Sequence, residues 1–411
     1  MKSLKSRYSL VMIKFGIIRE GKTPPDKRVV FTPAVLAKFK KQFPEAVIVV
    51  ESSDVRIFKD EEYREKGFEV ANDLSDCDVL LGVKEVPIEQ LIPNSKYFFF
   101  SHTIKQQPYN RDLLRTILDK NIELYDHEVL VEENGNRLVG FGRYAGIVGA
   151  YNGFRAYGLK HHLYTLPKAE TLQDQNELIF ELRQIPLPNI KIVLTGSGKV
   201  AFGAKEMLDA MEIKQVDVDA FLNEEFDFPV YARIDILDYN IHKEGKKTDR
   251  SHFYRNASEY DSDFGKFSEV ADFFIAGHFY ADGSPYILTQ EMLASPKNKI
   301  SVVADVSCDI DGPVACTIRP STIADPIYGY DAKSHSEVSF LDKYSIAVMA
   351  VDNLPCELPR DASDGFGEIF LKQVIPAFFN KDQDGVLERA QMTTSDGRLT
   401  EKFSYLTDYV K

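Results

Sequence analysis

Residues 191–211 constrain the fold more than any other stretch of this sequence. Ile192–Leu194 is a short apolar run of the kind that forms a buried parallel strand. Gly196, Gly198 and Ala201 follow at the spacing G-x-G-x-x-G/A, and an apolar stripe at helical intervals completes the segment. Such a strand, turn and helix bring a pyrophosphate close to the backbone and to the N-terminus of the helix. Glycine turns before helices also occur without ligands, but this context favours dinucleotide binding.

A carboxylate follows this motif at the expected distance. Asp217 lies 21 residues after Gly196, at the end of a second expected strand, Gln215–Val218. A carboxylate in this position accepts a hydrogen bond from a ribose hydroxyl and repels a 2′-phosphate, which favours NAD over NADP.

The length of 411 residues exceeds what one hydrophobic core usually serves, so we expect two domains. Strands alternate with helices, which predicts an α/β protein with two Rossmann-like, doubly wound parallel sheets and a cleft between the domains. We place a substrate domain at residues 1–139 plus 356–411 and a dinucleotide-binding domain at 140–355. The glycine-rich segment 140–153 suits a closely packed helix that passes between them, and residues 223–267 show no clear periodicity.

The strands expected in the first domain are short and apolar. They cover Met12–Ile18, Val47–Val50, Asp78–Val83, Tyr97–Phe100 and Ile122–Tyr125, with helices from Pro33 and over Leu113–Leu118. In the second domain we expect strands over Ala271–Ala276, Ile300–Val306 and Ile346–Val351, and a helix over Asp361–Val374 returns to the first domain.

Polar side chains follow the strands of the first domain. Arg28 lies in the loop after the first strand, Lys84 and His102 follow two later strands, and Asp126 and Glu128 follow the fifth. Because ligands bind outside the carboxyl ends of parallel strands, these groups are expected to converge. Lysine and histidine can act as an acid–base pair, and an arginine can clamp a carboxylate. The alternatives are a solvated lysine, a histidine that caps a turn and a surface ion pair between Arg28 and Asp26.

Net charge, apolar runs and cysteine spacing argue against nucleic-acid-binding, membrane-spanning, secreted and metal-binding proteins. The net charge of −13 disfavours nucleic acid or an anionic membrane as a partner, and no apolar run approaches the ~20 residues of a membrane helix. Lys14 interrupts the run Tyr8–Ile18, so we expect a first strand there and no signal peptide. The four cysteines have no metal-binding spacing, which favours reduced thiols in a cytoplasmic protein; no metal site is expected.

Several segments resemble the lysine–2-oxoglutarate reductase domain of aminoadipic semialdehyde synthases. More distantly, they resemble lysine-forming saccharopine dehydrogenase and the alanine dehydrogenase/transhydrogenase superfamily. The segments are Leu-Gly-Val-Lys84-Glu-Val-Pro, Phe-Phe-Ser-His102-Thr-Ile-Lys-Gln-Gln107, Arg137-Leu-Val-Gly-Phe141-Gly-Arg-Tyr-Ala-Gly146, Leu-Thr-Gly196-Ser-Gly198-Lys-Val, Asp305-Val-Ser-Cys-Asp309-Ile-Asp-Gly and Val-Asp352-Asn-Leu-Pro355.

The resemblance implies a role for each matching residue. Lys84 and His102 match the acid–base pair, and Glu128 matches a carboxylate that tunes it. Substrate-lining positions are matched by Arg28, Gln107 and Phe141. Cofactor positions are matched, or closely approached, by Arg137, Gly196, Gly198, Lys199, Asp217, Tyr280, Asp305, Asp309 and Asp352. Asn136 stands where the fungal enzymes have the first arginine of a pair, so one contact to a substrate carboxylate differs.

The resemblance implies an NAD- or NADP-dependent oxidoreductase of lysine metabolism that interconverts saccharopine with lysine and 2-oxoglutarate. The animal and plant reductases use NADP, whereas Asp217 favours NAD. The alternatives are another amino-acid or opine dehydrogenase, such as an alanine dehydrogenase, and a non-catalytic dinucleotide-binding protein. The expected partners are the small-molecule substrates lysine, 2-oxoglutarate and saccharopine, with a homo-oligomer of the chain left as an open alternative.

Overall fold

The computed structural model describes residues 12–281 and 283–411, which form two compact units. The first unit comprises residues up to Gly140 and Pro359–Lys411, and the second comprises Phe141–Leu358. The predicted division, at 139/140 and 355/356, lies within three residues of these boundaries. Tyr8–Val11 of the N-terminal apolar run lie outside the described residues.

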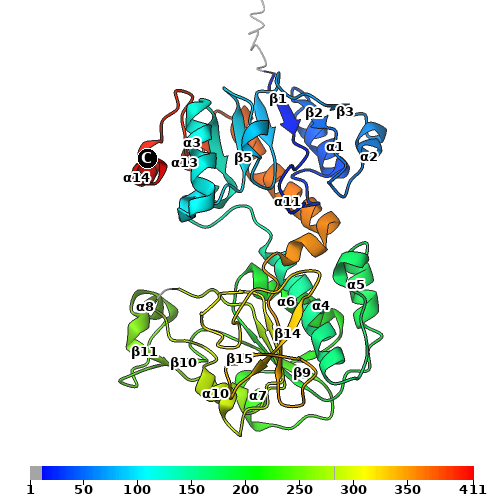
Figure 1. Ribbon diagram of the computed structural model, residues 1–411, viewed down its shortest axis with the longest axis vertical. Coiled ribbons are helices and arrows are strands. Elements are labelled where there is room, and N and C mark those ends of the chain that lie inside the picture. Colours follow the sequence, from blue (N-terminus) through cyan, green and yellow to red (C-terminus); the bar gives the residue numbers. More distant parts are fainter. Residues whose placement is uncertain (1–11, 282) are drawn as a thin grey trace, which may run out of the picture. The chain divides into compact units, whose positions relative to one another are not determined.

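Among its described residues, the first unit has a six-stranded parallel sheet in the order β3-β2-β1-β4-β5-β6 (Figure 1). The strands are β1 (Lys14–Ile17), β2 (Val47–Glu51), β3 (Glu69–Ala71), β4 (Val79–Leu81), β5 (Lys96–Phe99) and β6 (Glu123–Asp126). The main helices are α1 (Pro33–Gln42), α2 (Asp60–Glu65), α3 (Arg111–Asp119), α11 (Pro359–Gln373), α12 (Ile375–Phe379), α13 (Val386–Ala390) and α14 (Thr407–Val410). Thr32 caps α1 by accepting the amide of Val35, and Pro33 opens the helix as predicted.

Alternation along the strands builds a core on each face of this sheet. On one face, Phe98 packs against Phe370 of α11 and Phe378 of α12. On the other, Tyr97 and Phe99 belong to a buried cluster with side chains of α3 and α14. With both faces covered, the carboxyl edge of the sheet remains for function.

The second unit has an eight-stranded, largely parallel sheet among its described residues, in the order β15-β14-β16-β13-β12-β7-β9-β8. The strands are β7 (Lys191–Thr195), β8 (Lys214–Gln215), β9 (Val230–Ile234), β12 (Phe273–Ala276), β13 (Val302–Asp305), β14 (Ile327–Asp331), β15 (Ser336–Val338) and β16 (Ile346–Met349). The predicted α/β class with two largely parallel sheets is confirmed, and β14 departs from the parallel pattern by pairing antiparallel with both β15 and β16.

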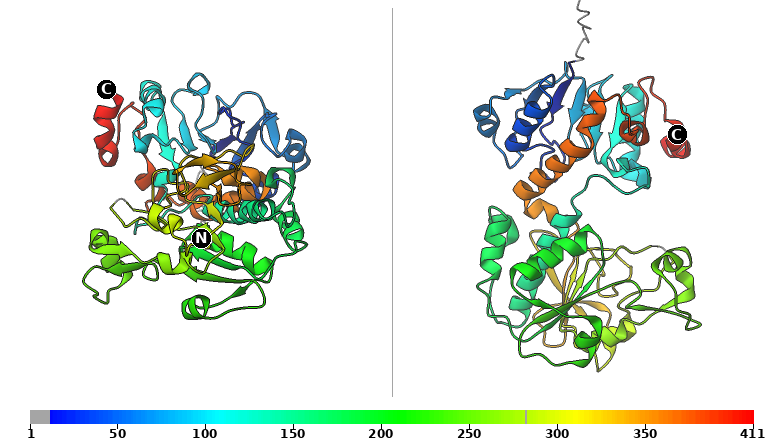
Figure 2. Two further views of the ribbon diagram at one scale, coloured as in Figure 1. Left: turned by 60° about the horizontal axis from the view of Figure 1, so that its bottom comes forward. Right: turned by 180° about the vertical axis from the view of Figure 1, so that it is seen from behind.

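Helices cover both faces of this second sheet (Figures 1 and 2). They are α4 (Gly142–Lys160), α5 (Gln175–Leu182), α6 (Lys199–Ala210), α7 (Val218–Asn223), α8 (Arg250–Arg255), α9 (Gly265–Ser268) and α10 (Gln290–Ala294). Phe273 of β12 faces Phe154 of α4, whereas the neighbouring Phe274 packs on Phe264 before α9. No helix among the described residues is both long and apolar enough to span a bilayer.

The segment 223–267, whose sequence shows no clear periodicity, forms several short elements. It contains β9, α8, α9, a two-stranded antiparallel pair of β10 (Asn240–His242) and β11 (Tyr260–Ser262), and the 3-10 turn η6 (Ala257–Glu259). Its apolar side chains, such as Phe253 and Tyr260, join the core beneath the sheet.

Candidate active site

The loops after β5 and β6 bring His102 and Glu128 together. His102 adopts a left-handed backbone conformation with φ of 55°, and its Nδ1 lies 3.3 Å from Oε2 of Glu128. On the other side of the ring, Nε2 lies 3.8 Å from Oε1 of Glu85. The imidazole is therefore held between two carboxylates, an arrangement that suits a group which gains and loses a proton.

Glu128 is the central carboxylate of a small network of charged side chains. Its Oε1 faces Nζ of Lys105 at 3.6 Å and a guanidinium nitrogen of Arg137 at 3.4 Å. Burial by itself would raise the pKa of Glu128, but the hydrogen bond from His102 and the two cations lower it to about 2. Glu128 is thus ionised at neutral pH. Arg137, predicted at a cofactor position, is exposed and contacts this carboxylate.

Glu85 is a functional candidate that the sequence analysis missed. It follows Lys84 directly in the chain, is buried, and accepts a hydrogen bond of 2.6 Å from Nζ of Lys22. The signal was present, because a second titratable residue follows the same strand, but only the tertiary structure turns it toward His102.

The backbone at Lys84 is held by the buried carboxyl group of Glu20. The amides of Val83 and Lys84 donate to the two oxygens of Glu20 at 2.6 and 3.0 Å. Glu20 has a φ of 63° and is almost fully buried. Burial raises its pKa to about 8, although the two amide hydrogen bonds oppose that shift. The backbone of Lys84 is therefore fixed by a group that sequence patterns did not single out.

Arg28 forms an ion pair with Asp26, the alternative to a role in substrate binding. Its Nε and one terminal nitrogen donate to the two oxygens of Asp26 at 3.0 and 2.6 Å. The pair is buried, not a surface pair. Burial opposes ionisation of Asp26, but the Arg28 guanidinium holds the pKa of that carboxyl well below its usual range.

Two other residues singled out in the first unit, Asp126 and Gln107, lie in different surroundings. Asp126 is buried and accepts the amides of Ser101 and Glu128 at 3.0 and 2.7 Å, so it ties the loops that carry His102 and Glu128. Burial raises the pKa of Asp126 to about 6. Gln107 is exposed, and its carbonyl accepts the hydroxyl of Tyr409 at 2.5 Å.

The second unit contains the glycine turn where the sequence places it. Gly196 has a φ of 104°, and a Cβ there would come within 2.5 Å of the carbonyl oxygen of Gly277. A Cβ at Gly198 would meet nothing within 4 Å, so space remains at the N-terminus of α6. This shape fits a pyrophosphate that approaches the helix N-terminus.

The expected strand Gln215–Val218 is wrong. The structure has a two-residue strand, β8, and Asp217 instead caps α7 by accepting the amide of Ala220 at 2.9 Å. β9 lies between β7 and β8, so Asp217 follows a strand that is not adjacent to the glycine turn.

A different carboxylate, that of Asp235, lies beside the glycine turn. It follows β9, whose last residue, Ile234, accepts the amide of Gly196 at 3.2 Å. Its carboxylate accepts the amide of Ile236 and pairs with Arg250 of α8. The β-branched and aromatic run at residues 230–234 signals this strand, but counting residues from the turn overlooks it because α7 is interposed.

A buried histidine, His278, lies at the carboxyl ends of β7 and β12, near the glycine turn. Nδ1 of His278, after β12, lies 2.8 Å from the hydroxyl of Thr195, and its buried Nε2 has no hydrogen-bond partner among the described residues. Burial lowers the pKa of His278 to about 4, so the ring is neutral at physiological pH. A neutral polar atom without a partner beside the glycine turn is consistent with a site for a bound molecule.

The remaining predicted residues of the second unit differ in exposure. Asp305 is buried, and its carboxylate accepts the amides of Ser307 and Cys308, both at 3.1 Å, and the hydroxyl of Thr317 at 2.6 Å. These bonds shape the loop after β13. Lys199 and Asp352 are exposed, and Phe141, Tyr280 and Asp309 are half-buried. None of the four cysteines, all of which lie within the described residues, forms a disulfide.

Comparison with known proteins identifies a family model and several relatives that this chain resembles. Residues 16–148 match the family model described as alanine dehydrogenase/PNT, N-terminal domain. Alpha-aminoadipic semialdehyde synthase of Arabidopsis thaliana is 27% identical over 436 residues, covering 95% of this chain and 41% of that protein. The chain therefore spans less than half the length of this relative.

A second relative matches over nearly its whole length. Saccharopine dehydrogenase [NAD(+), L-lysine-forming] of Candida glabrata is 28% identical over 368 residues, covering 85% of this chain and 88% of that enzyme. A solved structure of an L-alanine dehydrogenase superposes with a TM-score of 0.61 at 15% identity, covering 97% of this chain and all of that one. Residues 16–148 are therefore similar to the N-terminal domain of the alanine dehydrogenase/PNT family, and the whole chain has the α/β fold of that solved structure, built on two largely parallel sheets.

Proposed function

We propose that this protein is a saccharopine dehydrogenase that interconverts saccharopine with L-lysine and 2-oxoglutarate, using NAD(H). The observation that carries the proposal is the placement of His102 between Glu85 and Glu128, beside a Lys84 backbone fixed by Glu20. The relatives named for lysine formation and for aminoadipic semialdehyde synthesis support this substrate class.

His102 and Lys84 act as the acid–base pair. When lysine and 2-oxoglutarate condense, the amine adds to the ketone, and the carbinolamine loses water to give an imine. His102 takes the proton from the attacking amine and returns one to the departing hydroxyl, and Lys84 exchanges a proton with the oxygen on the same carbon as that oxygen changes from ketone to hydroxyl. Glu128 stays ionised and stabilises the protonated imidazole.

We infer that Arg28 orients a substrate carboxylate while it stays paired with Asp26, because a guanidinium has five N–H donors and the two side-chain bonds to Asp26 use two of them. Because the Arg28–Asp26 pair is buried and doubly hydrogen-bonded, its guanidinium is held in one orientation before substrate arrives. When bound, the dinucleotide supplies or accepts the hydride. In the second unit, Gly196 and Gly198 hold its pyrophosphate, and Asp235 holds the adenosine ribose.

Asp235 favours NAD(H) for a physical reason. A carboxylate beside the glycine turn can accept hydrogen bonds from ribose hydroxyls, whereas a 2′-phosphate would meet a like charge. Asp217 lies on the far side of β9 and caps α7, so we propose Asp235 for this role in its place. The choice of cofactor therefore rests on Asp235.

The test is oxidation of reduced cofactor, followed by nicotinamide absorbance, with purified protein and 2-oxoglutarate. Lysine, ornithine and ammonia are added in turn, with NADH and NADPH in parallel. Lysine-dependent oxidation of NADH is the expected result. Activity only with another amine, or with pyruvate in place of 2-oxoglutarate, would assign a different amino-acid dehydrogenase, and no activity with any pair would refute an enzymatic role of this kind.

A further inference from the structure

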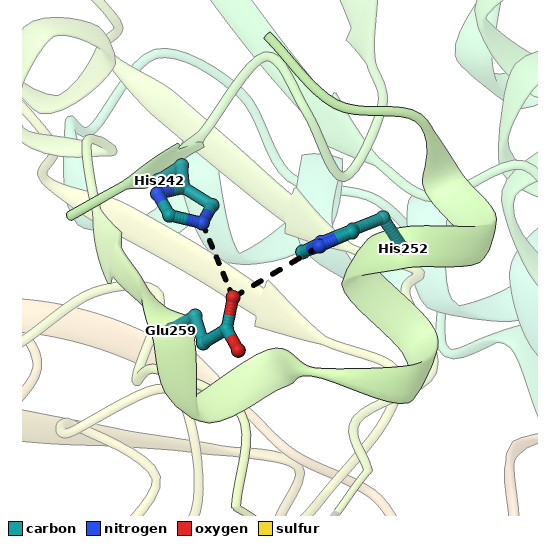
Figure 3. A group of neighbouring side chains, drawn as sticks. All are labelled: His242, His252 and Glu259. Atoms are coloured by element: carbon teal, nitrogen blue, oxygen red, sulfur yellow. Dashed lines mark hydrogen bonds and ion pairs between the residues drawn. The ribbon is translucent and has the colours of Figure 1, made fainter. Parts of the chain in front are cut away.

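Two histidines and a glutamate meet in the segment that follows β9 (Figure 3). His242 comes from β10, His252 from α8 and Glu259 from η6. Oε2 of Glu259 lies 3.2 Å from Nε2 of His242 and 3.9 Å from Nε2 of His252. One ligand atom of each residue lies within 4.8 Å of the other two, and no other such group occurs among residues 12–281 and 283–411.

The orientation of His252 prepares it to bind a cation. Its Nδ1 lies 2.9 Å from the hydroxyl of Tyr260, and that hydroxyl donates to Oγ1 of Thr248 at 2.6 Å. Since the Tyr260 proton is directed at Thr248, the hydroxyl accepts from Nδ1–H, and the lone pair of the neutral ring is on Nε2. That lone pair faces a carboxylate oxygen, which is unfavourable unless a positive charge lies between them. Metal-bound histidines characteristically donate their second ring N–H in this way.

His242 is more constrained. It is buried, and its Nδ1 accepts the amide of Glu244 at 3.0 Å. The Nε2 of the neutral ring therefore carries a proton, which it donates to Glu259. A metal must displace this proton, and the ring must either lose its last proton or turn away from the Glu244 amide. Metal binding through His242 therefore costs more free energy than binding through either of the other two ligands. Metal affinity also decreases as the pH falls.

We propose that His242, His252 and Glu259 form a binding site for a divalent transition metal, with Zn²⁺ as the fitting ion. Two imidazole nitrogens and one carboxylate oxygen are a donor set that zinc accepts, and calcium and magnesium favour oxygen ligands alone. Because of the cost at His242, we expect affinity in the micromolar range and not the tighter affinity of a preformed structural zinc site.

The site would fasten short elements that have little regular structure of their own. A metal here ties β10, η6 and α8 to one point, and α8 is shorter than two turns. The same helix carries Arg250, which pairs with Asp235 after β9. The metal site thus lies in the segment that positions the counter-ion of Asp235.

The experiment uses the full chain, first stripped with a chelator and then titrated with Co²⁺, which reports coordination by its visible absorption. Competition with Zn²⁺ gives the zinc affinity. The variants are His252→Ala and Glu259→Gln, which alter half-exposed or exposed side chains, and Tyr260→Phe, which removes the acceptor of the His252 Nδ1 proton. His335→Ala is the matched control, because His335 also contacts a tyrosine hydroxyl through Nδ1 and lies outside the cluster.

We expect one equivalent of Co²⁺ to bind to the wild-type chain and to the His335 control with equal affinity. Binding should weaken at least tenfold in the His252 and Glu259 variants, and about tenfold or more in Tyr260→Phe, as for other partners of a metal-bound histidine. Absence of saturable binding to the wild-type chain overturns the proposal. So does equal binding by all variants, or a loss in the His335 control as large as that in His252→Ala.

Discussion

Nδ1 of His102 and Oε2 of Glu128 lie 3.3 Å apart although 26 residues separate them in the chain. The two residues follow β5 and β6, which are adjacent parallel strands, so both loops open at the same edge of the first sheet. Asp126 then joins the loops by accepting amides from both. Parallel pairing of the strands is what converts a distant pair into a candidate catalytic contact.

The first prediction concerns the acid–base pair. The double variant Lys84→Met, His102→Gln should lower kcat by at least about a hundredfold, because general acid–base catalysis contributes roughly 10²–10⁴ in rate. NADH binding, measured by fluorescence titration, should not change. The matched control is Lys41→Met, His162→Gln, which alters an exposed lysine and an exposed histidine elsewhere. Unchanged turnover in the first variant would refute the assignment.

The second prediction separates the two candidate ribose carboxylates. Asp235→Asn should weaken NADH binding roughly tenfold or more, since a hydrogen bond to a charged group contributes about 1.5–3 kcal/mol. It should also improve binding of NADPH relative to NADH, because Arg250 loses its counter-ion near the ribose. Asp217→Asn should leave both affinities unchanged. Fluorescence titration measures both, and a larger effect at Asp217 would return the role to that residue.

The third prediction is a pH dependence of stability from Glu20. The pKa of this carboxyl rises from 4.5 to about 8 on folding, because burial disfavours its charged form. Between these values the folded chain binds more protons than the unfolded chain, so the free energy of unfolding falls as the pH rises. Over the whole range the free energy of unfolding falls by something on the order of 5 kcal/mol.

Urea unfolding at several pH values between 5 and 9 tests this effect. Glu20→Gln cannot titrate and should lose that share of the decline, so its curve against pH is flatter than the wild-type curve. Glu89→Gln removes the charge of an exposed glutamate in the same unit, and this variant should keep the wild-type slope of the free energy of unfolding against pH. Parallel curves for all three proteins would contradict the shift assigned to Glu20.

The fourth prediction concerns the contact between α4 and α6. A Cβ at Gly146 of α4 would collide with the carbonyl oxygen of Val200 in α6, whereas one at Gly142 would meet its nearest neighbour at an ordinary 3.4 Å. Gly146→Ala should therefore destabilise the protein by about 1–3 kcal/mol, the usual cost of overpacking. Gly142→Ala, on the same helix, should not. Thermal unfolding compares them, and equal stability would mean that the helices separate freely.

Local sequence determined much of this protein. The strand, glycine turn and helix at residues 191–210 and the capped start of α1 depend on neighbouring residues alone, and both were predicted. The alternation of strands and helices likewise fixed the α/β class and placed Lys84, His102 and Glu128 after strands. Each of these features follows from interactions between residues that are close in the chain.

Only the tertiary structure decided which strands are neighbours. β9 enters the sheet between β7 and β8, so Asp235 and not Asp217 lies beside the glycine turn, and no count of residues shows this. The same holds for Glu20 against the amide of Lys84, and for His242, His252 and Glu259 around one point. These contacts depend on strand order and on how loops fold back, which are set by packing across the whole domain and not by local preference.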